Sequence, residues 1–355
     1  MTATYPRVQA FKKDNPIQIR PGIAGKVALI GSFNSEETAP VYYSDLDLAY
    51  KELGSDTTFN GVAVLEDLFV GASGILAVNT TTWTGTGNEK TPDKSITTAK
   101  LTDALAKIKH EKFDCIFIAD LLTDAFLPII TDFLDERQLN KIPAGFGGAC
   151  SRTTLQEYTA TSELLGEHCY GVVTQQFKVK NNLLSLLKSG AYWTGVVAGL
   201  NVGNSMTKKI MPGVNGLEPE YNFEVSENGF TGLDLLQLGF MTFECLDREN
   251  NIYCCVNSEQ PNGYDLYINR VRDYVLREMA LITFLGDRNR ALTLGQVEQE
   301  LDRVRDVCVN TLDLLEGIDY HIVKAGANCV DVYVDRLLFA GVITEINVYF
   351  TVEVI

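Results

Sequence analysis

The sequence predicts an α/β (α+β) fold in which helices pack on a largely parallel sheet. Two observations lead to this class. Between residues 97 and 177, segments with helical spacing of apolar residues alternate with short apolar runs bounded by glycines, the order typical of α/β units. Residues 342–355 alternate strictly between apolar and polar side chains, which is the pattern of a half-buried strand. We therefore expect an α/β core with an extended terminal segment.

The composition narrows the class of protein. Apolar residues make up 46% and charged residues 21%, as in folded globular chains. The 30 Lys and Arg against 46 Asp and Glu give a net charge of −16, which argues against direct binding of nucleic acid. The first 22 residues lack the apolar run of a signal peptide, so we expect a cytosolic chain with reduced cysteines.

The N-terminal third is expected to form an arm and the first part of the α/β region. Residues 1–22 form the predicted N-terminal arm, where three prolines disfavour a helix. The region 23–95 then begins with a buried strand, "GKVALIGSF", at residues 25–33. A helix is expected over residues 44–55, with Ser44 as its N-cap.

The rest of this first region leads to a polar stretch. A second helix is expected over residues 61–71 and a strand over residues 74–81. Residues 81–95 are rich in Thr and Gly, so they are predicted to form a mobile surface loop.

Residues 96–205 form the predicted middle α/β domain. The expected helices cover residues 97–110, 124–139, 153–165 and 183–200, and the expected strands are "FDCIFIAD", "AGFGGA" and "GVVTQQF". This alternation predicts crossover connections between neighbouring parallel strands.

The C-terminal domain is expected over residues 206–341 and contains two well-specified helices. In the first, at residues 268–284, Asp273 and Arg277 are spaced to form an i, i+4 ion pair. The second begins at a predicted capping box of Thr293 and Gln296. Its predicted C-cap is Gly317.

The C-terminal arm, residues 342–355, contains neither Pro nor Gly. Its apolar face comprises Ile346, Val348, Phe350, Val352 and Val354. An unpaired strand of this composition favours aggregation. Two interpretations therefore remain open: the strand lies inside the chain's own sheet, or it adds to a sheet of a neighbouring subunit.

A search for catalytic or cofactor motifs finds little. The glycines of "GIAGKVALIG" have the wrong spacing for a P-loop, and the histidines and cysteines show no metal-ligand spacing. The best enzymatic candidate is Cys150 in "GFGGACSR", with His110 or His168 as base. Asp120 ends a strand, where α/β folds place ligands. The commoner interpretations are a buried cysteine and a turn aspartate.

Four stretches indicate the class of protein: "SGAYWTGVVAGLNVGNSMTKKIMPGVNGLEPEY", "FTGLDLLQLGFMTFECLD", the two C-terminal helices, and the terminal strand. In this order, and together with "GIAGKVALIGSF" and "LFVGASGILAVN", they resemble the tail sheath proteins of contractile phages and phage-like injection particles. Each motif alone is loose, but the likeness covers nearly the whole chain. Residues 81–95 depart from the family pattern.

The resemblance implies a structural subunit that is not an enzyme and needs no cofactor. Such subunits form stacked six-fold rings around an inner tail tube and contract to drive the tube through a cell envelope, so they meet a membrane only indirectly. Their expected partners are copies of the chain, the tube, and baseplate and tail terminator proteins. The expected location is the host cytoplasm during assembly, followed by the virion or tail-like particle.

The resemblance also implies which residues lie at interfaces. In the family, both terminal arms pair with strands of neighbouring subunits. The expected interface residues are Arg7, Val8, Ala10, Ile17, Ile19, Ile346, Val348, Phe350, Val352 and Val354. Because the chain lacks Lys from residue 210 to 323 but retains several Arg, we expect Arg270, Arg277 and Arg303 to face the tube. The alternatives are a tube or baseplate component and a soluble α/β enzyme that uses Cys150.

Overall fold

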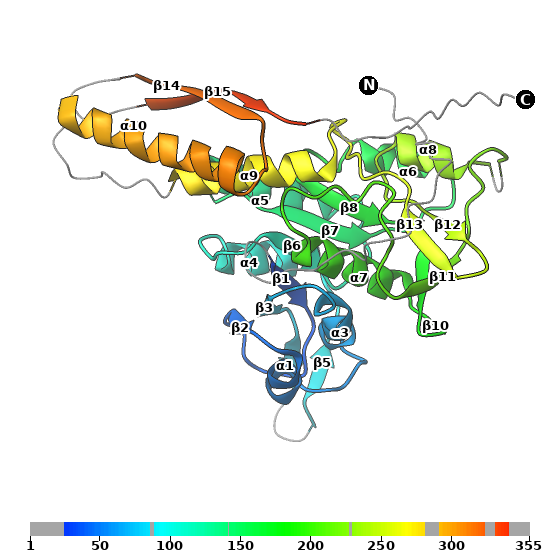
Figure 1. Cartoon of the computed structure of the whole chain (residues 1–355). Helices are drawn as coiled ribbons and strands as arrows, with labels where there is room; N and C mark the ends of the chain where they lie inside the picture. Colours follow the sequence, from blue (N-terminus) through cyan, green and yellow to red (C-terminus); the bar gives the residue numbers. More distant parts are fainter. Residues whose placement is uncertain are drawn as a thin grey trace, which may run out of the picture.

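The computed structural model describes residues 25–85, 89–140, 142–226, 229–280, 291–323 and 331–340. The predicted α/β fold is confirmed: helices cover both faces of a six-stranded sheet with the order β2-β3-β1-β6-β7-β8 (Figure 1). The strands are β1 (Lys26–Gly31), β2 (Val41–Tyr43), β3 (Gly74–Asn79), β6 (Cys115–Ile118), β7 (Gly145–Ala149) and β8 (Cys169–Val173). Their pairings are parallel except for the edge strand β2, which runs antiparallel to β3.

The first helices differ in detail from the prediction. Helix α1 (Leu46–Leu53) is N-capped by Asp45, whose side chain accepts the amide of Leu48; the predicted cap, Ser44, is wrong by one residue. The expected helix over residues 61–71 is two short helices, α2 (Asn60–Ala63) and α3 (Leu65–Leu68). Val64 interrupts the helix and separates the two segments; α2 packs on β1, whereas α3 packs on α7.

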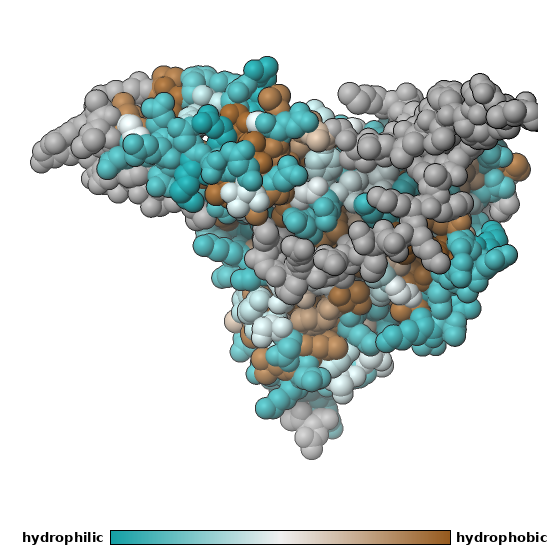
Figure 2. All heavy atoms as spheres, viewed as in Figure 1, coloured by the Kyte–Doolittle hydropathy of each residue, from teal (hydrophilic) through white to brown (hydrophobic). Residues whose placement is uncertain are grey.

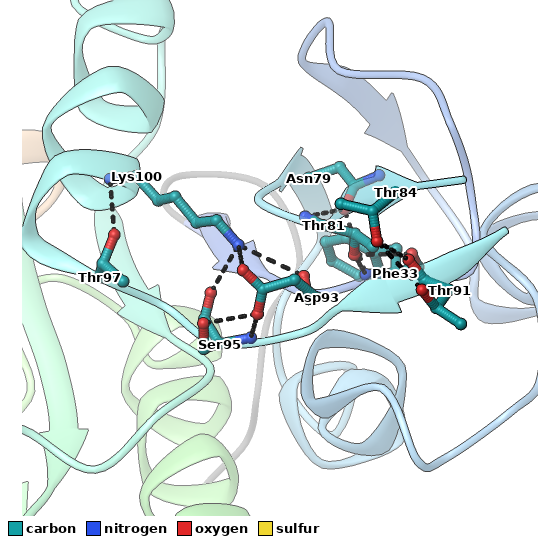
Figure 3. Close-up of polar contacts among 9 residues, drawn as sticks. All are labelled: Phe33, Asn79, Thr81, Thr84, Thr91, Asp93, Ser95, Thr97 and Lys100. Atoms are coloured by element: carbon teal, nitrogen blue, oxygen red, sulfur yellow. Dashed lines mark hydrogen bonds and ion pairs between the residues drawn. The ribbon is translucent and has the colours of Figure 1, made fainter. Parts of the chain in front are cut away.

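The predicted mobile loop at residues 81–95 is instead an antiparallel hairpin in its described part. Strand β4 (Thr82–Thr84) pairs with β5 (Thr91–Asp93). Figure 3 shows why this polar segment is ordered: the Lys100 ammonium lies 2.9 Å from the Asp93 carboxylate and also donates to two backbone carbonyls.

The base of this hairpin is fixed to the end of β1. The side-chain oxygen of Asn79 accepts the amides of Phe33 and Thr81, and the Thr81 hydroxyl donates to the Phe33 carbonyl (Figure 3). The bonds to Phe33 join segments that are 46 and 48 residues apart, so local sequence patterns do not reveal them.

The two faces of the six-stranded sheet carry different helices. One face is covered by α4 (Thr98–Lys107), α5 (Leu127–Leu139), α6 (Leu155–Ser162) and α8 (Gly232–Gln237). The other is covered by α1 to α3 and by α7 (Leu186–Gly199), which is buried along most of its length. Helix α7 approaches α3 closely, because a Cβ at Gly195 would lie only 2.4 Å from the Leu68 carbonyl oxygen.

Smaller sheets flank this core. Strands β9 (Gln176–Val179), β10 (Asn182–Leu183) and β11 (Val214–Glu218) form one, and β12 (Phe243–Asp247) and β13 (Ile252–Cys255) form another. Helices α9 (Leu266–Ala280) and α10 (Ala291–Asp306) then lead to β14 (Gly317–Val323) and β15 (Asp331–Leu338).

Both predicted caps of the second C-terminal helix are wrong. Thr293 lies inside α10, which already includes Ala291, and so cannot be its N-cap. The α-helix ends at Asp306, a π-helical turn follows at Val307–Thr311, and Gly317 is the first residue of β14. Its strand position, paired with Leu338, takes the place of a helix C-cap.

The expected domain division stays a prediction. Strands from the regions 23–95 and 96–205 form one sheet. The predicted N-terminal arm and the predicted C-terminal arm lie outside the described residues. No helix within the described part of the chain is long and apolar enough to cross a membrane.

Candidate functional site: an exposed two-stranded ribbon

Strands β14 and β15 form an antiparallel sheet of their own, here called the terminal ribbon. Figure 1 shows it at one end of the molecule, beside α10 and apart from the six-stranded sheet. Among the described residues, no third strand pairs with either of its edges. Two unpaired edges offer rows of free backbone donors and acceptors, which another strand can use.

Helix α10 covers the β14 side of the ribbon. Ile318, Tyr320 and Ile322 alternate along β14 onto one face. Ile318 is buried, and the Tyr320 hydroxyl donates to the Asp302 carboxylate of α10 at 2.6 Å. The Tyr320 ring also lies 5.9 Å from the Arg305 guanidinium. These contacts fix β14 on the helix.

The β15 side of the same face is left partly open. Val334 lies opposite Tyr320, and Val332 lies opposite Ile322, so these side chains share a face. Their exposed fractions are 41% and 39%. Figure 2 shows hydrophobic surface between hydrophilic residues at this end of the molecule. An apolar strip therefore runs along β15 without a complete cover.

The opposite face of the ribbon is polar along its middle, whereas Val323 and Leu338 at its two ends are each 40% exposed. His321 Nδ1 lies 2.7 Å from the Asp335 carboxylate, and the His321 ring stacks on Tyr333 with centroids 4.9 Å apart. Arg336 pairs with Asp319 through Nε at 2.8 Å. One apolar and one solvated face is usual for an antiparallel sheet; here the apolar face is covered by α10 at β14 and is only partly covered at β15.

Sequence reasoning did not predict this ribbon. The signal was present as period-2 alternation in "GIDYHIV" and "DVYVDRLL". The ten predicted interface residues of the two arms lie outside the described residues, so their role stays a prediction. The described chain reaches residue 340, two residues before the predicted C-terminal arm.

The three predicted tube-facing arginines have very different surroundings. Arg270 is 4% exposed and donates to the carbonyls of Leu200 and Asn201 at the end of α7. Arg277 pairs with Asp114, just before β6. Arg303 is exposed. A tube contact stays a prediction, and Arg303 is the one of the three with an exposed charge.

The predicted ion pair between Asp273 and Arg277 is wrong. Arg277 turns to Asp114 of another element, and Asp273 accepts the hydroxyl of Tyr170 at 2.8 Å. Asp273 also lies 3.3 Å from its neighbour Arg272. Tertiary partners therefore replace the local pair that the helical spacing favours.

The Cys150 environment does not match that of a nucleophile. The residue is fully buried, and burial raises the pKa of its thiol to about 12. His168 Nε2 lies 2.9 Å from the Asp135 carboxylate, and His110 is exposed after α4. No hydrogen bond of the described residues joins Cys150 to either histidine. Since a catalytic thiol needs a depressed pKa and a nearby base, this geometry favours a core cysteine.

The usual ligand position of an open parallel sheet is filled by the chain itself. Such ligands bind outside the carboxyl ends of the strands where the strand order reverses, here at β1 and β6. The Gly61 amide donates to the Ser32 carbonyl at this point, and a Cβ at Gly31 would lie 2.8 Å from both Gly61 Cα and Ala119 Cβ. Asp120 accepts the amide of Leu121, as a turn residue does.

No family model and no curated protein matches the sequence. The structure, however, matches a sheath tail protein from Desulfitobacterium hafniense with a TM-score of 0.70 and 13% identity, over 94% of this chain and 99% of that one. The chain has the fold of a tail sheath protein.

Two further structures agree with this assignment of the sheath fold. A sheath tail protein from Listeria innocua matches with a TM-score of 0.58 and 12% identity, over 89% of this chain and 96% of that one. The helical sheath of the anti-feeding prophage in its contracted state matches with a TM-score of 0.64 and 12% identity, over 98% and 99%. The resemblance inferred from sequence motifs is thus confirmed at the level of the fold.

Proposed function

We propose that this chain is a structural subunit of a contractile tail sheath, and that it assembles with copies of itself into a helical sheath. The terminal ribbon is the observation that carries the proposal, because it presents a partly covered apolar face and two strand edges that no other described strand pairs with. The likeness to sheath structures over nearly the whole chain supports it.

The assembly step is strand addition between copies. The C-terminal arm of one subunit adds to the β15 edge of a neighbour, with its apolar face over Val332 and Val334. Covering the rest of these two side chains contributes about 1 kcal/mol each, and the backbone hydrogen bonds of the new strand add to this. A donor strand on one copy and an acceptor edge on the next form a head-to-tail contact, which builds helices when it does not close.

The finer features of the proposal follow the sheath family. Subunits form stacked six-fold rings around an inner tail tube, with baseplate and tail terminator proteins at the two ends. The sheath contracts and drives the tube through a cell envelope. Contraction requires two packings of the same rigid subunits, and strands that stay paired would keep neighbours linked while the subunits rotate.

The location follows from the same proposal. Subunits assemble in the host cytoplasm and end in a virion or a tail-like particle, and they meet a membrane only through the tube. No step requires nucleic acid or a cofactor, since the rearrangement of subunits supplies the work.

Electron microscopy of the purified chain tests the proposal. The full chain is expected to form long hollow cylinders under negative stain. Deleting residues 343–355 is expected to abolish the cylinders while the subunit keeps its circular dichroism spectrum and melting temperature. A chain with residues 343–355 shuffled, so that the alternation is lost, should behave like the deletion.

Variants of the ribbon test the acceptor side. The double variant V332K/V334K is expected to shorten or abolish the cylinders, because it places two charges where the apolar strand face must lie. V225K is the matched control, since Val225 is also exposed, at 60%, but lies outside the ribbon. Cylinders that survive the terminal deletion, or a full chain that never exceeds a small oligomer, would refute the proposal.

A further inference from the structure

The carboxylate of Asp114 joins two segments that are far apart in the sequence. One oxygen, Oδ2, accepts the backbone amides of Gly25 at 2.7 Å and Lys26 at 3.1 Å. The other, Oδ1, pairs with the Arg277 guanidinium of helix α9. The sequence separations are 89 and 88 residues on one side and 163 on the other. A single side chain therefore bonds the start of β1 and the end of α9.

This carboxylate is held in the charged form. Only 17% of the Asp114 side chain and 24% of the Arg277 side chain are exposed. Burial alone would raise the pKa of Asp114, but Arg277 and the two backbone amides together lower it below its ordinary value. Both oxygens are thus available as acceptors over the physiological range.

Side chains from one face of helix α9 fix it to β8, to Asp114 just before β6, and to the end of α7. Arg270 donates to the Leu200 carbonyl at 2.9 Å, and Asp273 accepts the Tyr170 hydroxyl of β8 at 2.8 Å. Together with Arg277, these residues recur at helical spacing. Among these contacts, the one at Asp114 also reaches the start of β1.

The two segments that Asp114 joins lead toward the two chain ends. Gly25 lies three residues after the end of the predicted N-terminal arm, residues 1–22, and α9 leads through α10 to the terminal ribbon. We propose that Asp114 is a positioning residue that couples the root of the N-terminal arm to the helical unit carrying the ribbon. The consequence for a sheath rests on the proposed function: load taken up by one arm passes to the ribbon of the same subunit through this joint.

The contacts of Asp114 with Gly25 and Lys26 on one side and with Arg277 on the other, here called the joint, require two acceptor oxygens. A carboxylate offers one to each side, whereas an amide side chain has one carbonyl oxygen and one NH₂ donor. In D114N, the charge of Arg277 draws the carbonyl oxygen to itself, because hydrogen bonds to a charged partner are the stronger ones. The NH₂ group then faces the amides of Gly25 and Lys26, so both sides of that contact are donors.

This chemistry gives a test in which a change on one side is read on the other. Hydrogen exchange by mass spectrometry on the full-length subunit would follow a peptide that spans residues 20–31. D114N is expected to speed exchange of the two amides by about tenfold. Adding R277M to D114N frees the carbonyl to turn back to these amides. The double variant is therefore expected to exchange within about threefold of the wild type.

The rescue is the decisive outcome, because Arg277 itself does not contact the two amides. If the two contacts of Asp114 were independent, the amides of the double variant would exchange as fast as those of D114N, or faster. That result would overturn the inference. So would an unchanged rate in D114N alone. R303M on α10 is the matched control and should leave the peptide unchanged, since Arg303 is exposed and pairs within its own helix. The isolated subunit suffices for this test, so it fails or succeeds independently of sheath formation.

Discussion

Asp67 provides the sharpest prediction on stability. It lies on α3 against α7 and is 7% exposed. Its Oδ2 atom has no hydrogen-bond partner among the residues that the structure describes. Burial raises the pKa of this carboxyl from 3.8 to about 7, with Lys188 lowering it only in part. The folded protein therefore carries a carboxyl that is costly to ionise.

The raised pKa of Asp67 determines how the stability of the fold changes with pH. Between pH 3.8 and about 7 the folded state binds more protons at Asp67 than the unfolded state, so stability falls as the pH rises through this window. Above about 7, both states are ionised and the full penalty remains. At 1.36 kcal/mol per pKa unit, the penalty is at most about 4 kcal/mol above that pH and about 2 kcal/mol near pH 5.5.

The variant D67N removes the ionisation and keeps the shape. Its free energy of unfolding in urea is expected to exceed that of the wild type by up to about 4 kcal/mol near pH 8.5, and by little near pH 4. Fluorescence of Trp193, which is fully buried, reports the transition. D103N on exposed α4 surface is the control and should change neither value. An equal gain at both pH values, or none near pH 8.5, would refute the assignment.

Three further predictions concern the core. R137M is expected to destabilise the subunit by about 3 kcal/mol in urea, because the buried guanidinium donates to three carbonyls after α4; an effect below about 1 kcal/mol would contradict this. G195A should lower the melting temperature by at least about 5 °C, since its Cβ would meet the Leu68 carbonyl; an unchanged melt would show that α3 and α7 can separate. Cys150 should resist a thiol reagent near pH 8 in the folded chain while the partly exposed Cys245 reacts, and C150S should still form cylinders; rapid labelling of Cys150 would revive the enzyme interpretation.

The alternating α/β core could be predicted because its signals are local. Buried parallel strands such as β6 are short apolar runs, and the helices between them have their own caps, as at Thr154 and Glu157 of α6. The hairpin at residues 81–95 could not be predicted in this way. Its strands are polar, and they are fixed by Asn79 and Lys100 from neighbouring elements.

The site was predictable only in part for a similar reason. The alternation of the C-terminal arm is visible in sequence, and so is that of the ribbon. The partners of an arginine, by contrast, are not visible in sequence. Arg270 and Arg277 are of a residue type common at interfaces, yet they bond to Leu200 and Asp114 in other parts of the fold. A guanidinium serves buried carbonyls, buried carboxylates and interfaces equally well, so only the tertiary structure distinguishes these roles.

The structure of the ribbon gives the proposed strand addition an energetic basis. A two-stranded sheet is marginal in water, and three strands or a packed helix are needed for stability. Helix α10 supplies this cover on the β14 side, whereas Val332 and Val334 of β15 remain partly exposed. A third strand from a neighbour would complete the sheet, and the same pairing would remove the aggregation hazard of an unpaired apolar arm. In the proposed assembly, strand addition stabilises the arm and the β15 edge at once, and the deletion of residues 343–355 separates this contribution from the stability of the core.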